Sequence, residues 1–193
     1  MAVEDYHGKR VQALTLKAHG RPNDIVSQVK ISAVQGTSTG QQDVLEGKAI
    51  WDTGASGSVI SRNAASILGL QPVGRVKMRG AHTEQLSNRY FIDVVILESV
   101  GITRLQVAEA ELGADLIFLI GMDIMSLGDL ALTRGPDNTI FTFRIPSIEK
   151  PIDFGEEIKS YNSAMKQAHE SSPNLRAEIA KQRQSRSKKK RKK

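Results

Sequence analysis

The chain has 193 residues, 39% of them hydrophobic, with no cysteine and a formal net charge of +6. This length suits one well-buried domain with appendages and is short for two full-sized domains. The absence of cysteine excludes a disulfide framework and a thiolate metal site, and no apolar run approaches the roughly 18 residues of a membrane span. We therefore expect a soluble, cytoplasmic protein without a signal peptide or transmembrane segment.

The positive charge is concentrated at the C-terminal end. Residues 181–193 hold nine of the 27 Lys and Arg residues and no acid, which leaves 18 basic and 21 acidic residues, a charge of −3, elsewhere. The run Lys188–Lys193 could bind nucleic acid nonspecifically, attach to an acidic membrane surface, act as a localisation signal or keep the terminus solvated. We favour general electrostatic attachment, because no aromatic residues interleave with these charges as base stacking would require.

Along the chain, residues 1–24 are polar and predict a loosely attached N-terminal extension, in which Ala13–Lys17 alternates like an edge strand. Residues 25–148 alternate short runs of Val, Ile, Leu and Thr with Gly, Asn and Asp, which predicts an all-β domain. The strands predicted there are Val26–Val34, Leu45–Trp51, Val73–Arg79, Tyr90–Leu97, Thr103–Ala108, Leu116–Ile120, Leu130–Thr133 and Ile140–Ile145. Two short helices are expected: Ser61–Leu68, which stops at Gly69, and Met122–Ser126, which stops near Gly128.

The composition changes again after the β domain. Residues 149–180 predict a helical C-terminal extension, with helices at Phe154–His169 and Asn174–Lys181. Residues 181–193 are of low complexity and dense in charge, so we expect a disordered basic tail.

One segment, Ala49–Ser56, places an ionisable group at the end of an apolar strand. Gly54 allows a sharp turn and the close approach of another chain, and Thr53 can lock the loop through hydrogen bonds. The pattern also fits an ordinary strand-ending turn, in which the Asp52 carboxylate accepts backbone N–H groups. Because an Asp-Thr-Gly triplet can arise by chance, the surrounding sequence has to distinguish the two interpretations.

The segment Asp52-Thr53-Gly54-Ala55-Ser56 resembles the active-site signature of the retropepsin-type aspartic proteases, including their bacterial and other non-viral members. Leu116–Gly121 resembles the second hallmark of that family, an apolar strand that ends in glycine just before a short helix. Met122–Met125 follows it, as in the non-viral members.

Between these two segments, Val76–Glu84 and the strand Tyr90–Leu97 are similar in place and pattern to the flap, the hairpin that folds over bound peptide in this family. The flap has one glycine, Gly80, where many viral enzymes have several. The resemblance covers residues 26–146.

The resemblance implies an all-β, retropepsin-like fold: a closed, barrel-like β domain with one or two short helices, assembled as a homodimer. The chain has a single Asp-Thr-Gly and no repeated half, so each copy would contribute one catalytic Asp52 to a shared pair. Thr53 and Gly54 would support the active-site loop and the contact between copies at the two-fold axis. The expected substrate contacts are Ala55, Ser56, Gly80, Ala81 and His82, the last of which also fits a solvated loop histidine.

Other chemistries find less support. Asp123 is expected to cap a helix or to pair with a basic residue, and Trp51 to pack in the core. Ser56 and Ser58 do not fit the G-x-S-x-G elbow of serine hydrolases. Because neither H-E-x-x-H nor a phosphate-binding loop occurs, we expect no metal and no cofactor.

The sequence therefore predicts an aspartic endopeptidase that hydrolyses extended polypeptides with a water activated between two copies of Asp52. The alternative is a retropepsin-fold dimerisation or peptide-binding module with little or no turnover, attached to nucleic acid by its basic tail. The intact Asp-Thr-Gly favours the enzyme, because a binding module has no use for a costly pair of buried acids. A further hypothesis is that residues 1–24 or 150–193 block the cleft or the dimer interface until the enzyme cleaves itself.

Overall fold

In the computed structural model of the chain, the described residues fall into six ranges: 11–40, 43–79, 84–97, 100–113, 115–148 and 153–171. The chain divides into two compact units, Met1–Ile148 and Glu149–Lys193. Among the described residues, the first unit holds ten strands and two short helices, and the second holds one helix.

The strands are β1 (Gln12–His19), β2 (Val26–Ala33), β3 (Val44–Trp51), β4 (Val59–Ser61), β5 (Gly74–Arg79), β6 (Glu84–Leu97), β7 (Val100–Ala110), β8 (Leu116–Ile120), β9 (Asp129–Arg134) and β10 (Asn138–Ile145). The helices are α1 (Arg62–Ile67), α2 (Met122–Met125) and α3 (Phe154–Ser171). Burial alternates residue by residue along β1 and β10, which is the period expected of strands with one face on a core.

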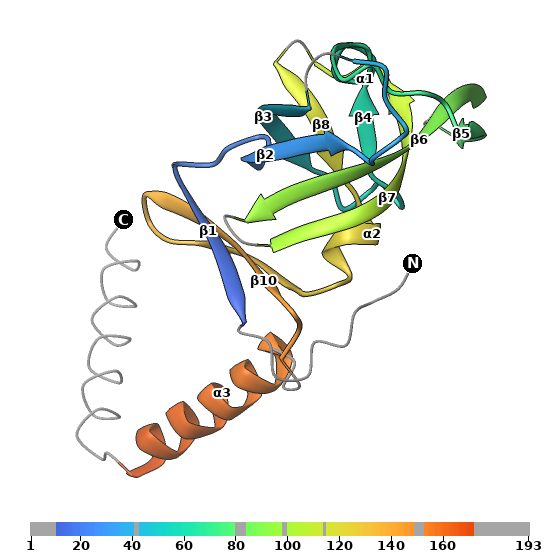
Figure 1. Ribbon diagram of the computed structural model, residues 1–193. Helices are drawn as coiled ribbons and strands as arrows, with labels where there is room; N and C mark the ends of the chain where they lie inside the picture. Colours follow the sequence, from blue (N-terminus) through green and yellow to red (C-terminus); the bar gives the residue numbers. More distant parts are fainter. Residues whose placement is uncertain are drawn as a thin grey trace. The chain divides into compact units, whose positions relative to one another are not determined.

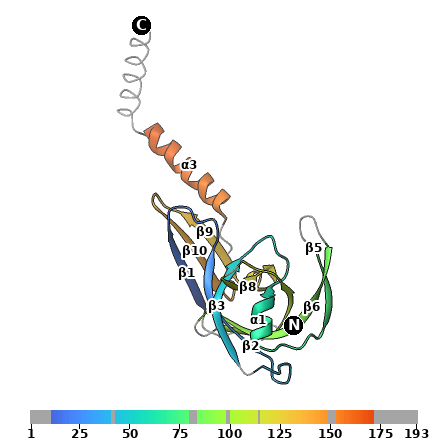
Figure 2. The same ribbon diagram turned by 90° about the horizontal axis from the view of Figure 1, so that it is seen from above.

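Six strands of the first unit close into a barrel (Figure 1, Figure 2). They pair in the order β2-β3-β8-β4-β7-β6, and a further pairing of β6 with β2 completes the ring. β5 pairs only with Glu84–Arg89, the first part of β6, while the rest of that strand belongs to the barrel. Closure leaves none of the six strands with a free edge. The predicted all-β fold with a closed barrel and short helices is confirmed.

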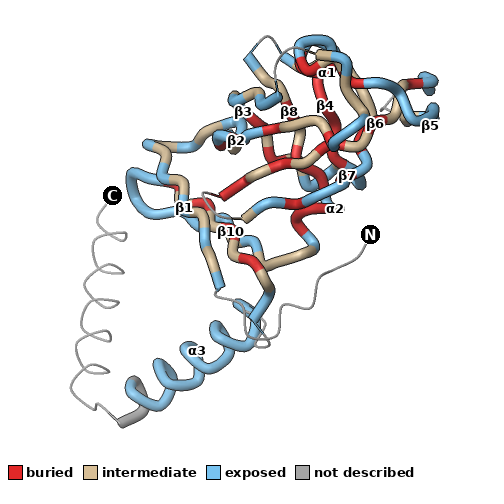
Figure 3. The backbone as a smooth tube through the Cα atoms, in the orientation of Figure 1, coloured by how far each residue is buried: buried red, intermediate tan, exposed pale blue. Residues whose placement is uncertain are grey.

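The core fills the inside of this barrel. Buried residues gather along β2, β4, β6 and β8, as the red segments of Figure 3 show. Ile31, Ile60, Ile92, Phe118 and Ile120 are fully shielded from solvent. These side chains come from four different strands, so the core packs together strands that lie far apart in the sequence.

A second sheet, in the order β1-β10-β9, carries residues from both ends of the first unit. β1 pairs with β10 along its whole length, so that Leu14 lies opposite Phe143 and Leu16 opposite Phe141. The expectation that residues 1–24 are a loose extension is therefore wrong for β1. The edge strand predicted at Ala13–Lys17 is confirmed, but it is longer, its backbone is paired along its whole length, and its two leucines pack on the core.

Trp51, the residue before the candidate acid, joins the barrel to the second sheet. Its indole N–H donates to the Ser27 hydroxyl at 2.9 Å, and its ring lies 4.9 Å from that of Phe141 and 5.1 Å from that of Phe143. The predicted role of Trp51 in core packing is confirmed, and the end of β3 is thereby fixed in place.

The second unit contains α3, which includes all residues of the helix predicted at Phe154–His169. Asp153 caps it by accepting the N–H groups of Gly155 and Glu156. Apolar side chains at spacings of four, three and four residues remain exposed along it: Phe154, Ile158, Tyr161 and Met165. The expected helix Asn174–Lys181 and the basic tail lie outside the described residues. Within the described part of the chain, no helix is long and apolar enough to cross a membrane.

A polar cluster joins α1 to β6 and β7. The Tyr90 hydroxyl donates to Glu109 at 2.6 Å, Arg62 donates to the other Glu109 oxygen at 3.2 Å, and Ser87 donates to the Glu109 carbonyl. Burial, and next the hydrogen bond to Glu109, raise the pKa of Tyr90 to about 12. Burial opposes ionisation of Glu109, but the hydrogen bonds from Tyr90 and Arg62 outweigh it and lower the pKa of that carboxyl.

Replacing Tyr90 should change how stability falls at high pH. A tyrosine in the unfolded chain ionises near pH 10, whereas folded Tyr90 stays neutral up to about pH 12, so its contribution is complete below pH 10 and is lost as pH rises towards 12. We expect the urea midpoint of the wild type to fall more steeply over this range than that of Tyr90→Phe. Tyr161→Phe, at an exposed site, should keep the wild-type slope; equal slopes for all three proteins would contradict the assignment.

Candidate active site

The parallel pairing of β3 with β8 brings the two predicted motifs together. Trp51 lies opposite Ile120 in the register, so both strands end at the same edge of the barrel. The backbone N–H of Asp52 donates to the carbonyl of Ile120 at 3.0 Å. The Asp-Thr-Gly segment and the Ile-Gly segment, 68 positions apart from Asp52 to Ile120, therefore form one structure.

The loop after β3 turns around the Asp52 carboxylate. The Gly54 N–H donates to Asp52 Oδ1 at 2.8 Å, and the Ala55 N–H donates to the Asp52 carbonyl at 3.2 Å. Asp52 is half-buried, whereas Thr53 and Gly54 are exposed. No hydrogen bond from the described residues reaches Oδ2 of Asp52. The acid is thus held by one oxygen and leaves the other available.

A second layer of contacts holds this loop from behind. The carboxylate of Asp123 in α2 accepts the Ser58 N–H at 2.9 Å and the Ser58 hydroxyl at 2.7 Å, and it also accepts the Ile124 N–H. The same Ser58 oxygen accepts the Gly121 N–H at 3.0 Å. The Asp123 carboxylate accepts a backbone N–H in the first turn of α2, as expected of a cap. Its main partner, however, is Ser58, 65 positions earlier, and no basic side chain of the described residues pairs with it.

Gly121 has to be a glycine because two backbones meet there. A Cβ at this position would lie 2.6 Å from the carbonyl carbon of Gly57 and 2.9 Å from the Ser58 nitrogen, closer than carbon atoms approach without a shift. The Met122 N–H adds a bond to the Ala55 carbonyl at 2.8 Å. The glycine that ends the β8 hallmark therefore has a direct packing reason.

The Asp52 loop forms one wall of a cavity of about 520 Å³. Residues 54–59 line one side, and Val76–Met78 of β5, in the predicted flap hairpin, lie on another. Ala55 and Ser56 are thus in the cleft where substrate contacts were expected. The other expected contacts, Gly80, Ala81 and His82, lie outside the described residues.

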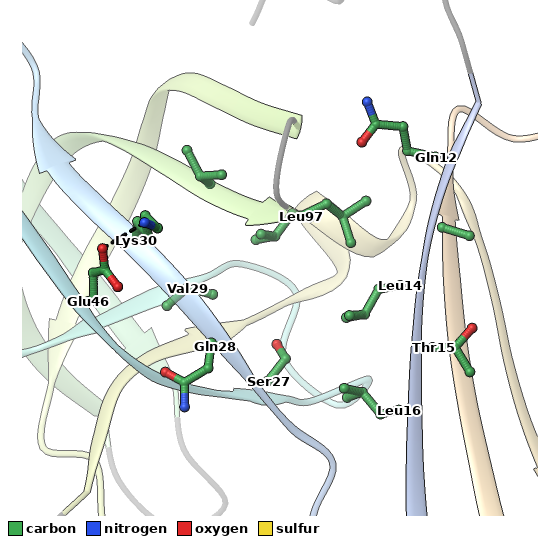
Figure 4. A pocket seen from close by; sticks show the side chains of 13 residues that line it. Gln12, Leu14, Thr15, Leu16, Ser27, Gln28, Val29, Lys30, Glu46 and Leu97 are labelled. Atoms are coloured by element: carbon green, nitrogen blue, oxygen red, sulfur yellow. Dashed lines mark ion pairs between the residues drawn. The ribbon is translucent and has the colours of Figure 1, made fainter.

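Another cavity, of about 500 Å³, lies between β1 and the strands β2 and β6 (Figure 4). Leu14, Val29 and Leu97 line it, and the ion pair of Lys30 with Glu46 lies at its border. None of its lining residues belongs to the Asp52 loop, so it is separate from the candidate site. Within the described ranges, no three His, Asp or Glu side chains gather as metal ligands would.

Sequence reasoning missed the supporting pair Ser58 and Asp123. Ser58 was considered only as a nucleophile, and Asp123 only as a helix cap or as the partner of a basic residue. The signal was a small hydroxyl residue two positions after the Asp-Thr-Gly-Ala-Ser start of the loop, with an acid two positions after Gly121. Spacing alone does not say that two such residues will meet.

Replacing Asp123 with Asn should destabilise the protein while leaving Asp52 unaltered. The amide group keeps one acceptor but presents a donor to an N–H or O–H of Ser58, and at this partly buried site a donor without an acceptor costs up to about 1–3 kcal/mol. We expect a lower free energy of unfolding in urea titrations of Asp123→Asn. Asp115→Asn, at an exposed acid 3.6 Å from Lys48, is the control and should be near neutral. An unchanged midpoint for Asp123→Asn would exclude this support role.

Comparison with known proteins bears on the same residues. A family model described as aspartyl protease matches residues 34–124. The match runs from just after β2 into α2 and contains the Asp52 loop, the β5–β6 hairpin and Gly121. No curated protein matches the chain.

Several solved structures are similar at low identity. A retropepsin-like aspartic protease from Rickettsia conorii is 16% identical with a TM-score of 0.43, and the alignment covers 70% of this chain and 96% of that one. The retroviral protease-like domain of Ddi1 from Leishmania major is 22% identical with a TM-score of 0.37, over 59% and 91%. A foamy viral protease-reverse transcriptase is 17% identical with a TM-score of 0.35, over 55% and 13%.

Because all three TM-scores are below 0.5, the assignment depends on the family match and on the motifs within it. Residues 34–124, which contain Asp52-Thr53-Gly54 and Gly121, match the aspartyl protease family model, and the predicted resemblance to the retropepsin-like aspartic proteases is confirmed.

Proposed function

We propose that the chain is an aspartic endopeptidase that works as a homodimer, with one Asp52 from each copy in a shared active site. The observation that carries this proposal is the state of the Asp52 carboxylate. It is half-buried at the end of β3, one oxygen accepts the Gly54 N–H, and the other accepts no bond from the described residues. Such an acid is positioned by the backbone and still has an oxygen available for a water molecule.

The need for a second copy follows from the chemistry. The chain contains one Asp-Thr-Gly, and peptide hydrolysis of this kind uses two carboxyls. Thr53 and Gly54 are exposed beside Asp52, so a two-fold axis through this loop would bring each of them next to its counterpart. The interface would be isologous, with Thr53 donating a hydrogen bond across the axis.

The reaction would then proceed without a covalent intermediate. Two carboxyls a few ångströms apart cannot both ionise at low cost, so they share one proton. The ionised Asp52 takes a proton from the bound water as its oxygen attacks the scissile carbonyl carbon, and the protonated Asp52 of the other copy gives its proton to the carbonyl oxygen. The resulting diol collapses, the C–N bond breaks and the leaving nitrogen receives a proton.

The substrates would be extended segments of polypeptides. The cavity lies between residues 54–59 and β5, where a peptide strand could pair its backbone with the protein and direct alternate side chains into pockets. Ala55 and Ser56 would contact the peptide from the Asp52 loop. Gly80, Ala81 and His82 would contact it from the flap.

The basic C-terminal tail would attach the protein to an acidic surface. Lys188–Lys193 carries six consecutive positive charges, which supports nonspecific binding to nucleic acid or to another acidic surface. The absence of cysteine supports a cytoplasmic location.

Replacing Asp52 with Asn should abolish peptide cleavage without unfolding the protein. The amide keeps an acceptor for the Gly54 N–H but cannot act as a base or an acid, and loss of such a group costs roughly 10²–10⁴-fold in rate. We expect wild type to cleave a mixture of peptides with a bell-shaped profile between about pH 4 and 7. Mass spectrometry of the products would give the rate and the cut sites.

Asp115→Asn, which removes an exposed carboxylate at the start of β8, should retain wild-type cleavage. Both variants should first be compared with wild type by sedimentation, so that dimer content is matched. Cleavage by Asp52→Asn at the wild-type rate would contradict the mechanism. If folded, dimeric wild type cleaves nothing, the chain is a peptide-binding module and not an enzyme.

A further inference from the structure

In the β5-β6-β7 sheet, Arg89 and Glu109 point to opposite faces. In the register, Arg89 lies opposite Gly74 on one side and Ala108 on the other. Residues directly opposite in a sheet point to the same face, and so do residues two apart in a strand. The Arg89 side chain therefore shares its face with Val76 and Met78, both of which line the cavity beside the Asp52 loop.

The acids of this region are on the opposite face. Glu109 follows Ala108 and so points away from Arg89, where it is bonded to Tyr90 and Arg62. Glu111 is also paired with Arg62, at 2.5 Å. These two acids already have partners, and the sheet separates Glu109 from Arg89.

Arg89 lines the cavity together with residues of the Asp52 loop, and no acid is among the lining residues. Lys77 is the other charged residue there, but alternation along β5 points its side chain to the opposite face from Val76. Arg89 is half-buried, and its side chain has no hydrogen bond or ion pair with the described residues. The undescribed flap tip, Gly-Ala-His-Thr at 80–83, contains no acid to neutralise it.

A guanidinium that is partly removed from water without an anion is poorly compensated, and a carboxylate supplies the strongest match to it. We infer that Arg89 forms an anion-accepting subsite of the cleft, so that the enzyme selects peptides carrying an Asp or Glu side chain. This inference rests on the proposed endopeptidase function. Two identical copies would place one Arg89 on each side of the scissile bond, so the preferred acidic positions should be symmetric about it.

The test uses pairs of peptides that differ only by Glu or Gln, with the substitution moved through each position on both sides of a known cut site. Wild type should cleave the best Glu peptide about tenfold faster in kcat/KM than its Gln partner, as a charge-assisted hydrogen bond would give. Arg89→Gln should reduce this ratio to about one. Arg89→Glu should favour Lys in place of Glu at the same position.

Arg75→Gln is the matched control, because Arg75 is exposed on the other face of the same hairpin and should leave the ratio unchanged. Raising the salt concentration should weaken the preference in wild type and have little effect in Arg89→Gln. A wild-type ratio near one, or a ratio that Arg89→Gln leaves intact, would overturn the inference while the proposed hydrolysis still stands.

A binding arm separates the two proposals. Fluorescent Glu and Gln peptides are titrated into Asp52→Asn and into the double variant with Arg89→Gln. If no peptide is cleaved by wild type, the proposed function fails, and the ratio of the two dissociation constants still decides the role of Arg89. Tighter binding of the Glu peptide that depends on Arg89 supports the subsite, and equal binding refutes it.

Discussion

The parallel pairing of β3 with β8 is the constraint on which the site depends. It brings Trp51 beside Ile120, so that the Asp52 loop and the Gly121 turn leave the barrel at the same point. Parallel strands need a long crossover, and here the crossover contains β4, α1 and the β5-β6-β7 sheet. The elements that separate the two motifs in sequence are therefore the ones that build the cleft wall. The Asp52 loop and the cleft wall beside it therefore follow from one connection.

Rigidity around Asp52 comes from burial on one side and hydrogen bonds on the other. Trp51 is held by Ser27 and by two phenylalanines of the second sheet, so the strand cannot slide. Beyond the acid, Ser58 and Asp123 tie the loop to α2. Asp52 itself is left half-exposed between these two anchors. Because Asp52 is half-exposed, water can reach the carboxylate oxygen that no described residue bonds.

Much of this could be read from the sequence because the relevant signals are local. The apolar runs that end in Asp52 and in Gly121 gave the strands and the family resemblance. The β4 strand could not be predicted, because three residues show no periodicity. The first part of β6, Glu84–Arg89, was also missed, because it is polar and pairs with β5 away from the rest of the barrel. Two features depend on the register between distant strands, which composition does not encode. One is the hydrogen bond between Ser58 and Asp123, and the other is the position of the Arg89 side chain on a sheet face without an acidic partner.

The most direct test of a shared active site is to mix wild type with Asp52→Asn. Equal amounts are incubated until the copies have exchanged, as verified by capture of two different tags, and peptide cleavage is measured at constant total protein. If each site needs Asp52 from both copies, only the dimers with two wild-type copies are active, and the rate should fall to about one quarter of that of pure wild type. A rate near one half would mean that each copy acts independently, and a rate near three quarters would mean that one Asp52 suffices in a shared site; either result would contradict the account.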